Sequence, residues 1–412
     1  MSPSAQNVSA NEVIAQRTAA AAAPRWSLSL RIAFRFFIVY LGLYVLLTQM
    51  FTSLVLATTN DSGAFEVDMT APAKAVVIWL AAHVFRIGHP IVTFETGSGD
   101  RIYDWIVLAF ILVAAILGTA IWCILDRKRT NYVKFHAWFR VFARFSLAAT
   151  MLVYGASKVL PLQMPFPDLY RMIEPFGNFS PMGVLWTFIG ASPAYEICVG
   201  FAETLGGLLL FSSRTTAIGA LVCLVDGIQV FLLNMSYDTP VKLLAFHLMV
   251  FSLFLLAPDA RRLANFFLLN RAAPPPDEAP LFRSARSNRI ALAVRILVAL
   301  YLVVGNVYGA VSEYSLYGPG APRSPLYGIW NVQDFTLDGQ SLPPLLTDAR
   351  RWHRLIFNYP QFMGIYGMDD TVRGYRIAFD KTAASFELTG GGGKDWKADF
   401  SFSRPAPGQL VL

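Results

Sequence analysis

The sequence predicts an α-helical polytopic membrane protein with a small antiparallel β-domain at its C-terminus. The first observation is composition: 55% of the 412 residues are hydrophobic and only 15% are charged, whereas soluble domains carry about 25% charged residues. The second is a series of apolar runs of about 20 residues, long enough to cross the hydrocarbon core of a bilayer. The third is a change near residue 318 to short alternating runs rich in aromatic and β-branched residues, which are typical of strands.

Seven apolar runs are predicted to span the membrane. The first, residues 32–57, is too long for the apolar part of a signal peptide and is predicted to be retained. The shorter run "AVVIWLAAHVF" (75–85) is too short to cross and predicts a re-entrant or interfacial helix. The remaining spans are expected at 104–125, 141–162, 193–212, 215–234, 239–257 and 290–311.

The distribution of Lys and Arg predicts the orientation of these spans. With the N-terminus inside, the inner segments hold 18 basic residues and the outer segments at most six, which agrees with the positive-inside rule. Seven crossings then place the C-terminal domain outside. The same distribution explains the net charge of +7. Because no stripe of basic and aromatic residues accompanies it, nucleic acid is not a predicted partner.

The predicted domains follow the spans and the changes in composition. The last residues, "GQLVL", resemble the beginning of a strand and indicate a truncated fragment. The expected segments are a disordered N-terminal tail (1–24), two spans with an outer loop and an interfacial helix (25–140), a four-helix core (141–271), an inner Pro-rich linker (272–289), a seventh span (290–311) and an outer β-rich sandwich or partial barrel (318–412).

Seven charged or titratable side chains lie in the predicted outer half of the core. A charge at mid-bilayer costs about 2.5–3.5 kcal/mol, so such residues mark interior faces or functional sites. At about 1.5 Å of rise per residue, Glu203, Asp226 and His247 lie too deep for snorkelling, while Asp238 and Lys242, four residues apart, are expected to pair at the rim. A polar network that only fixes the bundle is the alternative. The predicted ligand or proton site consists of Lys158, Glu196, Glu203, Asp226, Asp238, Lys242 and His247.

Histidine usage limits the cofactors that the predicted spans can hold. Only His247 of the five histidines lies at depth, whereas a bis-histidine haem needs two facing imidazoles, so intrinsic haem is not expected. No Glu-x-x-His pair is present for a di-iron bundle. No metal site is predicted, and a mixed site of Glu203, Asp226 and His247 is the alternative.

The three cysteines, Cys123, Cys198 and Cys223, all fall in predicted spans and show no CxxC spacing. Neither a disulfide framework nor a thiol-redox motif is therefore predicted. We expect these side chains to act as small buried hydrophobic groups.

Three segments of the core carry a resemblance to a known family. They are a helix ending in G-x-x-K within 143–161, a helix with A-E-x-L-G-G within 195–221, and N-x-x-Y-D-x-P-x-K-L with a downstream histidine within 234–271. Together they resemble the DoxX-like family of bacterial inner-membrane proteins. The resemblance implies a four-helix core, a location in the bacterial cytoplasmic (inner) membrane and a link to membrane redox chemistry. The family's motif positions correspond here to Lys158, Glu203, Asp238, Lys242 and His247.

Three functions are carried forward as hypotheses. The first is a redox-linked subunit that binds a quinone or another small molecule, with the electron-carrying cofactor on a partner subunit. The second is a transporter of a small solute, although no inverted repeat is evident in the sequence. The third is an envelope assembly protein whose outer β-domain binds a periplasmic protein. The extra spans and the β-domain lie outside the DoxX-like core, and the sequence assigns neither a reaction nor catalytic residues.

Overall fold

The computed structural model describes residues 25–57, 71–93, 99–272, 281–380, 384–390 and 396–412. The predicted disordered tail (1–24) and residues 273–280 of the predicted linker (272–289) lie outside the described residues, and residues 285–289 of that linker belong to α13 (Ala285–Leu316). Contacts divide the chain into two compact units: Met1–Tyr154 with Ala202–Asn306, here called the helical unit, and Gly155–Phe201 with Val307–Leu412, here called the sheet unit. This division cuts through helices and is not linear along the chain, so the predicted domain boundaries stay predictions.

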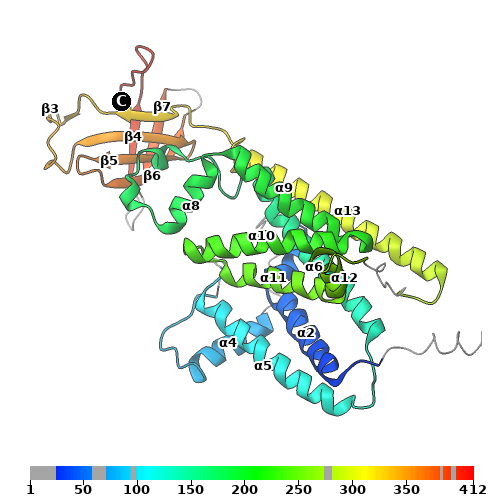
Figure 1. Cartoon of the computed structure of the whole chain (residues 1–412). Helices are drawn as coiled ribbons and strands as arrows, with labels where there is room; N and C mark the ends of the chain where they lie inside the picture. The colour runs from blue at the N-terminus through cyan, green and yellow to red at the C-terminus, as the bar shows by residue number, and fades with distance from the viewer. Residues whose placement is uncertain (1–24, 58–70, 94–98, 273–280, 381–383, 391–395) are drawn as a thin grey trace, which may run out of the picture. The chain divides into compact units, whose positions relative to one another are not determined.

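Long apolar helices dominate the helical part of the chain (Figure 1). Within the described residues, five helical stretches are long and apolar enough to cross a membrane: 28–47, 102–125, 213–236, 242–267 and 285–316. A sixth is obtained if α8 (Pro181–Gly190) and α9 (Pro193–Leu210), bent by 96° at their break, form one span. The chain is therefore a mostly helical membrane protein, and the predicted number of seven spans is not confirmed.

Two of the predicted spans differ from the observed helices, each for an identifiable reason. The first breaks at Thr48, whose extended backbone (φ −130°, ψ 173°) separates α2 (Leu28–Leu47) from α3 (Gln49–Leu56). The Thr48 hydroxyl stabilises the break by donating to the Tyr44 carbonyl at 2.7 Å. The predicted span 141–162 lies largely within α6 (Val133–Val159), whose basic side chains lower its apolar character.

The remaining helices are α4 (Ala71–His83), α5 (Ile102–Leu125), α10 (Thr216–Ser236), α11 (Lys242–Leu256), α12 (Ala260–Phe267) and α13 (Ala285–Leu316). In the helical unit α2 packs on α5, and α10 packs on α11. Small residues bring α9 and α10 together. A Cβ added at Gly206 would lie 2.8 Å from the sulfur of Cys223, and one at Gly219 would lie 2.9 Å from the Cβ of Leu209. Cys223 is buried, as expected, whereas Cys198 is exposed and Cys123 is half-buried.

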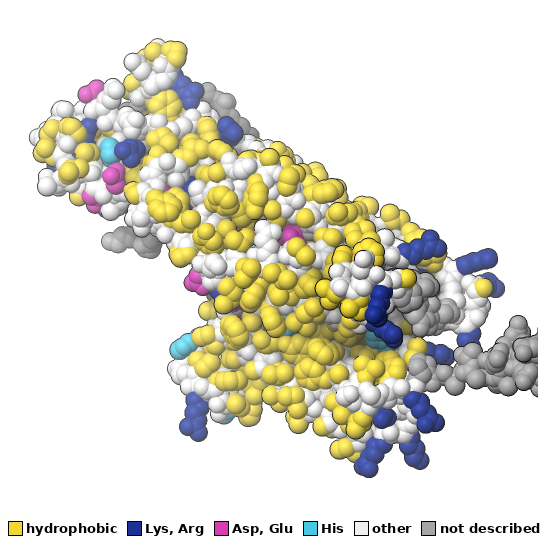
Figure 2. Space-filling model, in the orientation of Figure 1, with side chains coloured by type: hydrophobic (Ala, Val, Ile, Leu, Met, Phe, Trp, Pro, Cys, Tyr) yellow, Lys and Arg dark blue, Asp and Glu magenta, His cyan; other side chains and the backbone are white. Residues whose placement is uncertain are grey.

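The surface of the helical unit is apolar along its helices and basic at one end (Figure 2). At that end the loop between α5 and α6 meets the start of α2: the Trp26 N–H donates to the Thr130 carbonyl at 3.0 Å, and Arg31 donates to the Arg129 carbonyl at 2.7 Å. Exposed large apolar side chains are frequent along α5 and α13. In water such surfaces would favour association, so they indicate helices that face lipid.

The sheet unit contains an antiparallel six-stranded sheet with the order β1-β4-β5-β6-β7-β8. A separate hairpin joins β2 (Thr336–Leu337) to β3 (Gln340–Ser341) through Asp338 and Gly339, both with positive φ, as a two-residue hairpin turn requires. The strands of the sheet are β1 (Gly328–Asn331), β4 (Trp352–Tyr359), β5 (Phe362–Gly367), β6 (Val372–Phe379), β7 (Ser385–Thr389) and β8 (Lys397–Ser401).

The predicted C-terminal β-domain is confirmed, with two strands outside the predicted alternating runs. They are the two-residue β3 and β5, where glycines interrupt the alternation in "FMGIYG". The sheet is a single layer and not a sandwich. It curls, since the Trp352 ring on β4 lies 6.0 Å from the Phe400 ring on β8, although three strands separate β4 from β8 in the sheet order. A partial barrel is therefore the better description of the two expected alternatives.

Candidate functional site

His247 lies in the middle of α11 and is fully buried. Its Nδ1 is 2.6 Å from the carbonyl oxygen of Leu243, one helical turn earlier. Because a carbonyl only accepts hydrogen bonds, Nδ1 is the protonated nitrogen of the neutral ring, and Nε2 is then an acceptor. Nε2 is 2.8 Å from the hydroxyl of Tyr40, which therefore donates to it. Both ring nitrogens are satisfied.

Two tyrosines of α2 hold this imidazole. Tyr40 and Tyr44 are four residues apart and so share one face of the helix. The Tyr44 ring stacks on His247 with centroids 3.7 Å apart and an interplanar angle of 11°. Tyr44 is 4% exposed, whereas Tyr40 is only partly buried. The hydroxyl that bonds to His247 therefore belongs to a side chain that reaches the surface of the helical unit.

The predicted rim residues form a second group at the start of α11. The expected ion pair is present, with Lys242 Nζ 2.8 Å from Asp238 Oδ1. The Asp100 carboxylate accepts from the backbone N–H groups of Lys242 at 2.7 Å and Leu243 at 3.0 Å. It thereby satisfies two of the N–H groups that the beginning of a helix leaves unpaired. Asp100 was not predicted as a member of the site.

The two deep carboxylates are buried on neighbouring stretches of the chain, Glu203 on α9 and Asp226 on α10. Glu203 is 3% exposed and Asp226 is 7% exposed. Both residues have interaction partners in the structure. The hydrogen bonds of His247 go instead to α2 and to its own helix. A shared ligand site for Glu203, Asp226 and His247 stays a prediction.

Lys158 and Glu196, the other two predicted residues, belong to the sheet unit. Both are buried, and Glu196 accepts a hydrogen bond from the Met164 N–H at 2.9 Å. The helices that carry them approach closely, because a Cβ added at Gly200 would lie 2.6 Å from the Cβ of Lys158. The seven predicted residues are thus divided between two units, five in one and two in the other.

The sequence prediction missed Tyr40, Tyr44 and Asp100 because it searched the four core spans for charges. A signal for the tyrosines is present in "VYLGLY", where two phenols share one face of an apolar helix. Such polar tips need a partner when buried. In the part of the chain that the structure describes, no three His, Cys, Asp or Glu side chains are grouped as a metal site would require.

Comparison with known proteins places the chain beside a bacterial relative. The protein of Bacillus subtilis (strain 168) that carries the name uncharacterized protein YwoB is 36% identical over 131 residues, which are 32% of this chain and 80% of YwoB. The chain belongs to the family of YwoB. No family model matches the chain, and no solved structure matches it. The DoxX-like resemblance is not tested by these comparisons and stays a prediction.

Proposed function

We propose that this membrane protein binds a quinol or a comparable lipophilic small molecule at the Tyr40–His247 pair and serves membrane redox chemistry as a subunit of a larger assembly. The observation that carries the proposal is the 2.8 Å hydrogen bond between a buried imidazole and a partly exposed phenol. Polar groups on apolar helices are costly and are retained mainly where they bind ligands or move protons.

The direction of this hydrogen bond suits the reduced form of the ligand. With Nδ1 protonated and bonded to Leu243, the Tyr40 hydroxyl donates to Nε2, and its oxygen still has a lone pair. A quinol hydroxyl can donate to that oxygen. On oxidation the quinol would lose two electrons and two protons. One proton would move to the Tyr40 oxygen while the Tyr40 proton moves to Nε2 of His247, and the second would pass from the other quinol hydroxyl to water. Histidine suits this role because its charge changes near neutral pH. The electrons would pass to a redox cofactor on the partner subunit.

The proposed orientation has the N-terminus inside the bacterial inner membrane and the β-domain outside. It is supported by the basic end of the helical unit, where Arg31 lies beside the α5–α6 loop and Arg140 pairs with Asp259 at 2.8 Å just before α12. Basic residues accumulate on the cytoplasmic side of membrane proteins. The start of α11 with Lys242, and the Asp100 carboxylate that binds it, would then lie at the outer rim.

The experiment measures binding of decylubiquinol to the purified protein in nanodiscs under anaerobic conditions. Tyr40→Phe keeps the ring and removes the hydroxyl, so the quinol loses its acceptor, and we expect affinity to fall by about tenfold. Tyr44→Phe is the matched control. Its hydroxyl makes only a 3.4 Å contact with the Leu243 carbonyl, and the ring that stacks on His247 is unchanged. Absence of binding by the wild-type protein, or equal losses in the two variants, would contradict the proposal.

A further inference from the structure

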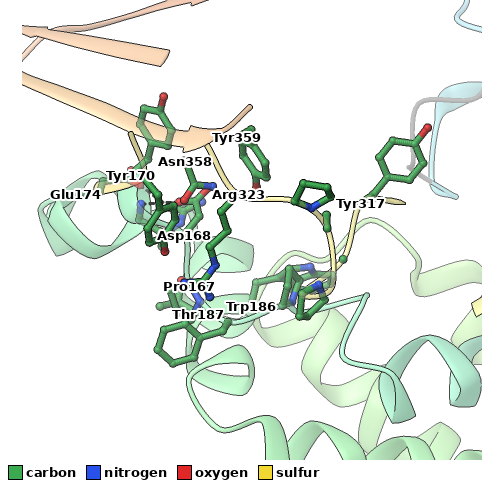
Figure 3. Close-up of a pocket in the computed structure, with 18 residues that line it drawn as sticks. Pro167, Asp168, Tyr170, Glu174, Trp186, Thr187, Tyr317, Arg323, Asn358 and Tyr359 are labelled. Atoms are coloured by element: carbon green, nitrogen blue, oxygen red, sulfur yellow. Dashed lines mark hydrogen bonds and ion pairs between the residues drawn. The ribbon is translucent and has the colours of Figure 1, made fainter. Parts of the chain in front are cut away.

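A cavity of about 420 Å³ lies wholly within the sheet unit (Figure 3). Its walls come from the segment 165–174, which contains α7 (Leu169–Ile173), from α8, from the segment 317–327 that follows α13, and from the end of β4. The volume falls within the range of small-molecule sites. The sequence prediction placed no site here, because the first two wall segments lie more than 100 residues along the chain from the other two.

The position of α7 on the sheet is fixed by close contacts. The Tyr170 ring lies over β5 where Gly364 leaves room for it, since a Cβ at Gly364 would come 2.4 Å from the ring. The Tyr170 hydroxyl contacts the carbonyl of Ile356 at 3.4 Å, and the Leu169 N–H contacts the Asn358 side-chain oxygen at 3.4 Å. These contacts hold one wall of the cavity against β4 and β5.

Aromatic rings make up much of the lining. Their flat apolar faces can pack against a ligand while their polar tips remain available for hydrogen bonds. In the view of Figure 3, Tyr170 and Tyr359 lie above Trp186, and Tyr317 lies to their right. The six aromatic residues of the lining are Phe166, Tyr170, Trp186, Tyr317, Tyr327 and Tyr359.

The charged side chains of the lining balance one another, with two acids and two arginines. Arg171 is already paired with Glu174 at 2.6 Å. Arg323 lies over the Tyr327 ring at 4.6 Å and, among the described residues, its guanidinium forms no hydrogen bond or ion pair. In Figure 3 its side chain runs toward Pro167 and Thr187. The Arg323 guanidinium is thus available to donate hydrogen bonds to a ligand, and the charged side chains of the lining sum to a net charge of zero.

Two phenols of the cavity, Tyr170 and Tyr359, stay neutral. Burial raises the pKa of Tyr359, and the nearby Asp168 carboxylate raises it further. Burial likewise raises the pKa of Tyr170 above its ordinary value. These hydroxyls therefore remain hydrogen-bond donors at every physiological pH and add no charge to the site.

We propose that this cavity binds a neutral saccharide. Saccharide rings present C–H faces that pack on aromatic side chains, and their hydroxyls both donate and accept hydrogen bonds. Arg323 and the phenols supply donors, while Asp168 and Asn358 supply acceptors at the same cavity. The carboxylates of Asp168 and Glu174 would repel an anionic ligand. The guanidinium groups of Arg171 and Arg323 would repel a cationic one. A neutral polyhydroxylated ligand therefore suits the wall best. This proposal goes beyond the proposed quinol site and does not depend on it.

The test measures binding of two probes, N,N′-diacetylchitobiose and cellobiose, to the purified full-length protein by isothermal titration calorimetry. We expect at least one of them to bind. Trp186→Ala should weaken that binding by about tenfold or more because a packing face is lost, whereas Trp186→Phe should retain most of it. Arg323→Ala should weaken it by about fivefold through the loss of charge-assisted hydrogen bonds.

The matched control is Arg376→Ala, because Arg376 is also exposed in the sheet unit but lies on β6, outside the lining. It should leave saccharide affinity unchanged. Glucose 6-phosphate tests the charge argument and should bind no more tightly than the neutral probes. Tighter binding of that phosphate, failure of both neutral probes, or an equal loss in the Arg376 and Arg323 variants would overturn the proposal. Circular dichroism of each variant separates a lost site from a lost fold.

Discussion

Arg35 in the helical unit and Arg351 in the sheet unit are both only 2% exposed, but they bind different parts of the chain. Arg35 lies on α2 and donates to the Tyr132 hydroxyl at 2.9 Å, to the Cys123 sulfur at 3.0 Å and to the Asp126 carbonyl at 2.8 Å. All three partners are located at or near the end of α5 or in the loop that follows it.

Arg351 precedes β4 and donates only to backbone carbonyls. Its partners are Leu342 at 2.6 Å, Gln333 at 2.8 Å and Val332 at 3.3 Å, all in loops that flank the β2–β3 hairpin. The arginine thus holds these loops beside the sheet. A side chain with five fixed donors is well suited to satisfy several carbonyls at once.

The difference between the two arginines has one cause. A helix uses its own backbone hydrogen bonds internally and leaves free groups only at its ends, whereas the loops of a β-domain leave carbonyls free at many places. Buried arginines of the helical unit therefore find carbonyls at helix ends, as Arg144 does with the Leu210 carbonyl at the end of α9, at 2.8 Å. His247 differs, because it sits in mid-helix and reaches a side chain on another helix. The buried carboxylates Glu203 and Asp226 also lie in mid-helix, so the phenol partner on α2 distinguishes His247 as the candidate site.

The largest expected effect tests the loop carbonyls of the sheet unit. Arg351→Met leaves three carbonyls without their donor and should lower the free energy of unfolding by about 3 kcal/mol, measured by thermal unfolding of the purified protein. Arg350→Met is the matched control, because the Arg350 side chain is 67% exposed and surface substitutions change stability by about 0.5 kcal/mol or less. Equal effects of the two substitutions would remove the contrast between the two units.

A second prediction, with a smaller expected loss of stability, concerns the way in which a side chain caps a helix end in the helical unit. Asp100→Asn leaves only one acceptor for the N–H groups of Lys242 and Leu243 and should destabilise the start of α11 by about 1 kcal/mol. Hydrogen exchange of those two amides should become faster. Asp238→Asn, at a side chain that is 84% exposed, should leave their exchange nearly unchanged. Unchanged exchange in the Asp100 variant would show that another group caps this helix.

The smallest effect concerns pH and the sheet unit alone. Burial raises the pKa of Tyr170 in the folded protein, whereas an unfolded tyrosine ionises near pH 10. Below about pH 10 the phenol is protonated in both the folded and the unfolded chain, so the raised pKa does not change stability. Above about pH 10 the unfolded chain loses a proton that the folded chain keeps, and the free energy of unfolding therefore falls as pH rises. Tyr170→Phe should make this alkaline loss shallower, as followed by unfolding between pH 8 and 11. Tyr317→Phe, at a position that is 81% exposed and lies after the end of α13, should not. Parallel curves for the Tyr170 variant and the wild type would rule out this contribution.

Much of the fold followed from local patterns in the sequence. Apolar runs of sufficient length predicted the membrane helices, and alternation predicted most strands of the β-domain, because both signals depend on neighbours within one element. The break at Thr48 and the strand β5 were missed, because a threonine hydroxyl and closely packed glycines act through contacts that hydropathy does not record.

By itself the sequence determined that this chain enters a membrane, that it carries a β-domain, and that His247 and several charges lie in apolar helices. Only the tertiary structure decided their partners: Tyr40 lies 207 positions from His247 along the chain, and Asp100 lies 142 positions from Lys242. The reason is physical. Helix and strand periodicity follow from adjacent residues, whereas a hydrogen bond between distant elements depends on how their packed faces meet, and no local pattern encodes that arrangement.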